Sequence, residues 1–81
     1  MNEISILKKK IIYIAQHRGI KEMDILLSQF VKKYLNELSA IELNDLYEFL
    51  QHHDNKIFDW YNNKISLPSN SITTRLKNFK I

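Results

Sequence analysis

The sequence contains no cysteine, one glycine, one proline and no long apolar run. Without cysteine it cannot form a disulfide, a zinc–thiolate site or a thiol nucleophile. A single glycine is too few for a glycine-rich phosphate loop, and no stretch approaches the roughly 20 apolar residues of a membrane-spanning helix. These absences exclude several classes of enzyme and predict that the chain does not insert into a membrane.

The length sets a second limit. A chain of 81 residues forms one domain, residues 1–81, and buries about 60–65% of the surface that its unfolded chain exposes. Such a domain has a small core and no deep substrate cavity, so its function is expected on its surface. We therefore expect a binding protein without catalytic residues rather than an enzyme.

The charge balance is basic, with a net charge of +3 and a pI near 9.2. A small basic domain that binds nucleic acid is therefore one alternative. Only Lys8–Lys10 forms a run of cations, however, and such runs are usually solvated helix faces. The segment around Glu42, Asp45 and Glu48 is acidic. We expect no nucleic-acid partner.

The spacing of apolar residues predicts an all-α bundle of about five helices. In the second predicted helix, apolar residues recur every three or four positions without a gap from Met23 to Tyr34. Scarce glycine and proline also argue against a turn-rich β protein. The predicted helices run from about Ile4 to His17, from Lys21 to Asn36, from Ser39 through Leu50, from Asp54 to Tyr61, and from Ser69 or Ser71 through Phe79.

Polar residues at the predicted helix ends suggest how each end is capped. Ser39 and Glu42 have the spacing of a capping box. Asp54 is expected to cap the fourth helix. Gly19 follows the first helix, where a residue of positive φ is common, and Arg18 is expected to interact with the dipole of that helix.

Two clusters could carry chemistry, but each has a structural explanation. His52-His53-Asp54 resembles part of a metal site, yet neighbouring side chains on a helix point about 100° apart, and no third histidine lies at ligand spacing. We expect no metal there. Phe58, Trp60 and Tyr61 could stack on bases or flavin, but in so small a domain their helical spacing favours core packing.

The octet His17–Asp24, HRGIKEMD, contains the only glycine and one of only two arginines in a lysine-rich chain. It could be a simple turn in which Glu22 pairs with Arg18. Alternatively, the guanidinium of Arg18 could bind carboxylate or phosphate oxygens, and Gly19 could allow a partner's backbone to approach closely. The residues thus leave open a helix turn and a partner-binding surface.

Arg18-Gly19-x-x-Glu22, followed by an apolar residue and Asp24, resembles the RGxxE motif of the succinate dehydrogenase assembly factors. These are the small bacterial SdhE proteins and their mitochondrial relatives. The resemblance covers about residues 11–68 and leaves 69–81 as a variable tail. Further matching positions are Phe30, Tyr34, Leu38, Ser39, Leu50, Asp54, Phe58, Trp60 and Pro68.

This resemblance implies an all-helical accessory protein without enzymatic activity. The family binds the flavoprotein subunit of succinate dehydrogenase, and often that of fumarate reductase, and promotes covalent attachment of FAD. On this basis the chain binds no cofactor itself, because FAD belongs to the flavoprotein. The implied partner-binding residues are Arg18, Gly19, Glu22, His17, Asp24 and Asp54.

We also expect a monomer. Mitochondrial relatives carry a transit extension, which this chain lacks before Met1, and this points to bacterial cytoplasm. One departure is Asn62-Asn63-Lys64, where relatives commonly carry glycine after the tryptophan. Asparagine tolerates the left-handed conformation, so we expect the turn to be kept. Some proteins of this shape have been proposed as antitoxin-like regulators, which is a further alternative for this chain.

Overall fold

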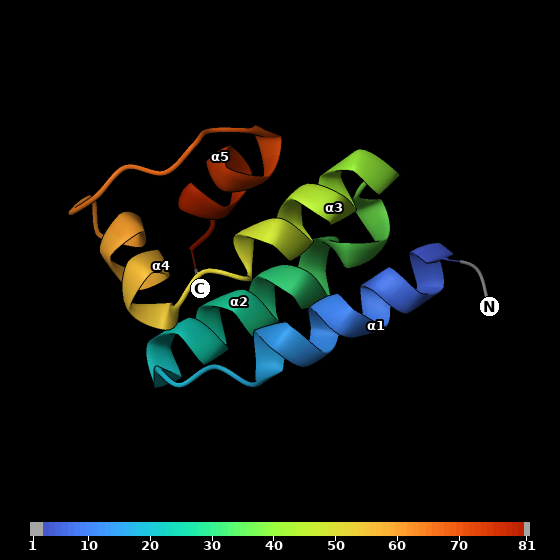
Figure 1. The fold of residues 1–81 in the computed structure, drawn as a ribbon, viewed down its shortest axis with the longest axis horizontal. Coiled ribbons are helices and arrows are strands. Elements are labelled where there is room, and N and C mark those ends of the chain that lie inside the picture. Colours follow the sequence, from blue (N-terminus) through green and yellow to red (C-terminus); the bar gives the residue numbers. More distant parts are fainter. Residues whose placement is uncertain (1–2, 81) are drawn as a thin grey trace.

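The computed structural model describes residues 3–80, which form five α-helices and one short 3₁₀ helix (Figure 1). The prediction of an all-α bundle is confirmed, and no strand occurs in this range. The expected domain limits, 1 and 81, lie outside the described residues. The helices are α1 (Glu3–Gln16), α2 (Lys21–Tyr34), η1 (Leu35–Glu37), α3 (Ala40–Phe49), α4 (Asp54–Tyr61) and α5 (Ser71–Lys77).

The two longest helices, α1 and α2, run side by side in opposite directions (Figure 1). Helix α3 packs against α1, α5 packs against α3, and α4 lies beside the first turns of α2. Each helix turns its apolar stripe inward because neighbours three or four positions apart share one face. The buried core comprises Ile11, Ala15, Met23, Leu26, Leu27, Phe30, Val31, Leu35, Leu38, Leu43, Leu46, Phe49, Leu50, Ile57, Trp60, Ile72 and Leu76.

Two helix ends behave as the sequence predicts. Ser39 and Glu42 form a reciprocal capping box at the start of α3, with hydrogen bonds of 3.1 and 3.2 Å. Asn63 adopts φ of 65° just after α4, so the expected left-handed turn is present with asparagine.

The last helix starts at Ser71, one of the two predicted starts, and ends at Lys77, before the predicted end at Phe79. Neither serine is its N-cap. The cap is Asn70, whose side chain accepts a 2.9 Å bond from the Thr73 amide while the Thr73 hydroxyl accepts one from the Asn70 amide. Asparagine is as good an N-cap as serine, so only the three-residue spacing to Thr73 distinguishes this position.

The helices are short relative to a lipid bilayer. The longest have 14 residues, which corresponds to about 21 Å of helix against a hydrocarbon core of about 30 Å. Among residues 3–80, no helix combines the length and the apolar character needed to span a membrane.

Candidate partner-binding site

The elbow, defined as residues 17–24, joins α1 to α2 and is held in place by Arg18. The guanidinium Nε pairs with Asp54 Oδ1. Nη1 and Nη2 donate to the carbonyl oxygens of Leu50 and His52, each at 2.8 Å. The Arg18 side chain is only 7% exposed. In this structure, therefore, Arg18 binds its own chain and fixes the elbow against the α3–α4 connection.

This arrangement corrects two expectations for Arg18. It interacts with the end of α3, where Leu50 is the C-cap residue, and not with the dipole of α1. A cation there satisfies carbonyl groups that lack partners within the helix. Its ion-pair partner is Asp54 and not Glu22, and within residues 3–80 Glu22 belongs to no ion pair.

Asp54 caps α2 and not α4, contrary to the sequence prediction. Its Oδ2 accepts hydrogen bonds from the backbone amides of Gly19 and Ile20, the latter at 3.0 Å. The N-cap of α4 is His53, whose side chain makes no capping bond. Asp54 thus satisfies amides at the start of α2 while it neutralises Arg18, and a carboxylate there is also favoured by the helix dipole.

Gly19 is required for close approach and not for a special backbone angle. The expectation of positive φ is wrong, since the only positive φ in residues 3–80 belongs to Asn63. A Cβ at position 19 would lie 3.2 Å from Asp54 Oδ2, closer than most real contacts of this kind. The missing side chain lets the carboxylate reach the amides.

The remaining predicted site residues form the outer surface of the elbow. His17, Gly19 and Glu22 are exposed, and Asp24 is half-buried in the first turn of α2. The structure therefore brings all six predicted residues to one region but divides them by role. Arg18 and Asp54 are internal, and the other four face or border solvent.

The two histidines before α4 were the candidate metal ligands in the sequence. Among residues 3–80, no group of three potential metal ligands comes together. The backbone of His52 accepts from Arg18, and its ring packs edge-on against Phe49 at 5.7 Å. Burial, together with the positive charge of Lys56, lowers the pKa of His52 below its usual value.

The aromatic cluster of α4 packs in the interior. Trp60 is 6% exposed and lies 5.0 Å from the ring of Phe49. The Lys77 ammonium lies 4.5 Å from the Trp60 ring centre. Tyr61 donates a 2.9 Å hydrogen bond to the carbonyl oxygen of Phe79. These contacts favour core packing over a platform for bases or flavin.

Comparison with known proteins identifies the family. The family model described as "Flavinator of succinate dehydrogenase" matches residues 9–80. The chain belongs to this family. The match includes the whole elbow and the Asp54 region, and it extends well beyond Pro68.

Individual relatives of this flavinator-family chain carry related names. It is 35% identical over 77 residues to "Succinate dehydrogenase assembly factor 2, mitochondrial" of Dictyostelium discoideum, covering 95% of this chain and 55% of the relative. A Scheffersomyces stipitis protein of the same name is 42% identical over 57 residues, covering 70% and 38%. "FAD assembly factor SdhE" of Acetobacter pasteurianus is 31% identical over 70 residues, covering 86% and 64%.

The chain spans less than two thirds of the length of each of these three relatives. No solved structure matches the chain significantly.

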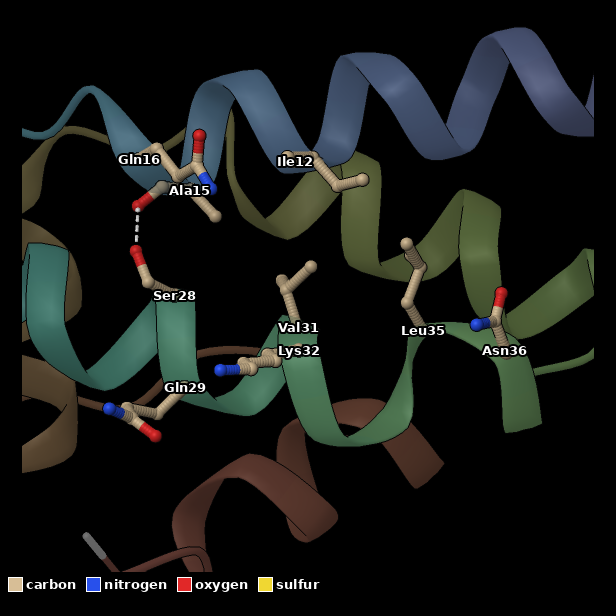
Figure 2. Close-up of a pocket in the computed structure, with 9 residues that line it drawn as sticks. All are labelled: Ile12, Ala15, Gln16, Ser28, Gln29, Val31, Lys32, Leu35 and Asn36. Carbon is tan, nitrogen blue, oxygen red and sulfur yellow. Dashed lines mark hydrogen bonds between the residues drawn. The ribbon is translucent and has the colours of Figure 1, made fainter.

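An open groove of about 340 Å³ runs between α1 and α2 of this flavinator-family domain (Figure 2). Ile12, Val31 and Leu35 point into it, and Ser28 closes one end by donating a 3.2 Å bond to the Ala15 carbonyl. Its lining contains one charged side chain, Lys32, and no carboxylate. An apolar floor with one cation suits contact with another molecule better than acid–base chemistry.

Sequence reasoning missed two components of the site. The carbonyl groups that bind Arg18 belong to the backbone, so no residue type indicates them. Tyr13, one helical turn before His17, stacks on the His17 ring and is 63% exposed. Its position on the exposed face of α1, four residues from the elbow, was the available signal.

Proposed function

We propose that this chain binds the flavoprotein subunit of succinate dehydrogenase through the elbow and promotes covalent attachment of FAD to that subunit. Membership of the flavinator family supports this proposal. The relatives named as succinate dehydrogenase or FAD assembly factors support it as well. These relatives are longer than this chain, so we propose, by similarity, that the chain shares their activity.

The observation that carries the proposal is the pre-formed elbow. Arg18 donates to two carbonyl groups of the α3–α4 connection, and Asp54 at the start of α4 accepts from the Ile20 amide. These bonds fix the backbone of residues 18–20. Glu22 and the Gly19 backbone are left exposed on that fixed surface. A surface already ordered before binding loses less entropy when a partner docks. Glu22 is then the charged group available to pair with a cation of the flavoprotein.

In this proposal the chain has no catalytic residue and holds no cofactor. The bond to FAD forms at a histidine of the flavoprotein, and this chain contributes binding and positioning. The flavoprotein of fumarate reductase is proposed as a second partner. We further propose that the chain acts as a monomer and that it works in bacterial cytoplasm. The bacterial relative supports that location, whereas relatives named as mitochondrial favour the organelle.

The test is an in vitro flavin-attachment assay. Purified apo flavoprotein subunit of succinate dehydrogenase is mixed with FAD and this chain, samples are denatured over time, and the flavin fluorescence retained on the polypeptide is measured. Glu22→Ala is expected to slow attachment roughly tenfold at sub-saturating concentration. That factor corresponds to a lost contact of about 1.4 kcal/mol.

The matched control is Glu48→Ala, which removes an exposed glutamate of α3. It should attach flavin at the wild-type rate. If wild-type protein fails to accelerate attachment to a flavoprotein that is competent to bind FAD, the proposed function is wrong. If Glu22→Ala and Glu48→Ala behave alike, the elbow is not the working surface.

A further inference from the structure

Tyr13 is an exposed aromatic side chain beside the elbow. It is 63% exposed, and the other large apolar side chains recorded as exposed in residues 3–80 are all isoleucines. Tyrosine provides a large contact area with few rotatable bonds, which is why it is enriched at the centres of binding interfaces. An exposed tyrosine next to a candidate interface therefore needs an explanation.

His17 holds the Tyr13 ring in place. The two ring centres lie 4.0 Å apart with an angle of 20° between their planes. His17 Nδ1 lies 2.7 Å from the Tyr13 carbonyl oxygen. A carbonyl can only accept, so Nδ1 carries the hydrogen and the orientation of the His17 ring is fixed. The Tyr13–His17 stack is thus ordered without a partner, which lowers the entropy cost of binding.

The stack and the elbow form one continuous surface. His17 immediately precedes Arg18, whose three hydrogen-bonded contacts fix the chain at that point. Tyr13 lies on α1, four positions before His17, which is the first residue after that helix. A partner that contacts Gly19 and Glu22 can therefore also contact the neighbouring Tyr13–His17 stack.

Charge on this surface favours an acidic occupant. Lys10 is exposed three positions before Tyr13, and the only acidic residue of α1 is Glu3, in its first turn. Beyond the elbow turn, the first turn of α2 carries Glu22 and Asp24 together with the exposed Lys21. The face of α1 is therefore the more positive side of this surface, and the aromatic stack separates it from the two acids. A partner surface of the opposite order can bind in one orientation only.

We infer that the Tyr13–His17 stack is a second contact surface for the flavoprotein, binding a region of that partner that is rich in carboxylates. The inference rests on the proposed function, because it takes the same protein as the occupant. In it, Tyr13 packs on the partner, His17 positions Tyr13, and Lys10 pairs with a carboxylate.

The test is the dissociation constant of the purified apo flavoprotein subunit for variants of this chain. Tyr13→Ala is expected to weaken binding at least tenfold, and Tyr13→Phe, which keeps the ring, to stay within about threefold of wild type. Ile41→Ala removes a side chain that is 75% exposed on α3, and it should leave the dissociation constant unchanged. Because Tyr13 is largely exposed, all these variants should keep the wild-type circular dichroism spectrum.

The role of charge is tested with Lys10→Glu and its control Lys64→Glu, which changes another exposed lysine, in the turn after α4. Lys10→Glu should weaken binding at least fivefold at low salt and less at high salt, where the charges are screened. Wild-type binding that neither Tyr13→Ala nor Lys10→Glu weakens would overturn this inference and leave the proposed function standing. Absence of wild-type binding would overturn both.

Discussion

Arg18 illustrates how a residue that stands out in a sequence can act differently from expectation. Its rarity in a lysine-rich chain indicated a site that needs a planar guanidinium. The structure meets that need with one carboxylate and two carbonyl groups of the same chain. Asp54, the charged partner, is 36 positions away. No local pattern could have paired them, because the contact depends on how α4 packs beside α2.

Neutralising Asp54 is expected to destabilise the domain. Asp54→Asn keeps the size of the side chain but removes the charge that compensates Arg18, which is 7% exposed while Asp54 is 15% exposed. We expect the free energy of unfolding to fall by about 3 kcal/mol, at the lower end for a buried ion pair because both groups keep some solvent contact. Urea unfolding followed by circular dichroism measures the change.

Glu48→Gln serves as the control, since it neutralises an exposed acid outside this network. It should alter stability by less than about 0.5 kcal/mol. Equal stabilities for Asp54→Asn and Glu48→Gln would contradict the structural role assigned to the pair.

Gly19→Ala tests the close approach of Asp54. The new methyl group would lie 3.2 Å from Asp54 Oδ2, and that carboxylate is held by Arg18 and two amides. We expect a loss of about 1 kcal/mol from crowding. In an Asp54→Ala background the crowding disappears, and Gly19→Ala should become neutral or stabilise by about 0.5 kcal/mol through the unfolded state. If Gly19→Ala lowers the free energy of unfolding equally in the Asp54→Ala background, crowding against Asp54 is not the cause.

At the scale of helices, the sequence predicted those features that depend on neighbouring residues in the chain. The 3.6-residue period predicted the number and order of helices, and the Ser39–Glu42 capping box is present as expected. Predictions failed where a helix end is satisfied by a distant segment. Asp54 has the residue type of a local cap but serves α2, because Arg18 draws its carboxylate away from α4. Capping rules consider only residues close in the chain, so they could not predict that a distant arginine and the amides before α2 bind this carboxylate.

Glu42 links the start of α3 to α5 and makes this contact sensitive to pH. Its carboxylate accepts from the Ser39 amide and, at 3.1 Å, from the Ser71 hydroxyl, and it lies 3.8 Å from Arg75. The hydrogen bond from the Ser39 backbone is the largest cause that lowers the pKa of Glu42 below its ordinary value of 4.5, and Ser71 adds to it. The folded state therefore favours the ionised form of Glu42.

The lowered pKa gives a stabilising contribution with a defined pH window. That contribution is complete above the ordinary value of 4.5 and is lost as the pH falls through the lower pKa of the folded state. Glu42→Gln should be less stable than wild type at pH 7, and the gap between them should narrow on acidification. A gap that stays constant in melting experiments across the acidic range would contradict this.

At the scale of the whole molecule, the small core explains why the candidate site lies on the surface. Seventeen buried apolar residues, named above, form the core, and the α1–α2 groove is open to solvent (Figure 2). The length predicted this arrangement, and the family assignment agrees with the resemblance carried by the RGxxE motif. The sequence could not show that the elbow is fixed from within, because that depends on the end of α3 and the start of α4 packing against the α1–α2 turn at Arg18.

The most direct test of the account is amide hydrogen exchange of this chain with and without the apo flavoprotein subunit. The amides of Lys21 and Glu22, in the first turn of α2, lack partners within the helix and should exchange quickly in the free protein. We expect flavoprotein binding to slow the exchange of these two amides. The exchange rates of the Ser71 and Ile72 amides, in the first turn of α5, should stay unchanged. Slowed exchange at α5 without any change at Lys21 and Glu22 would contradict the claim that the elbow is the binding surface.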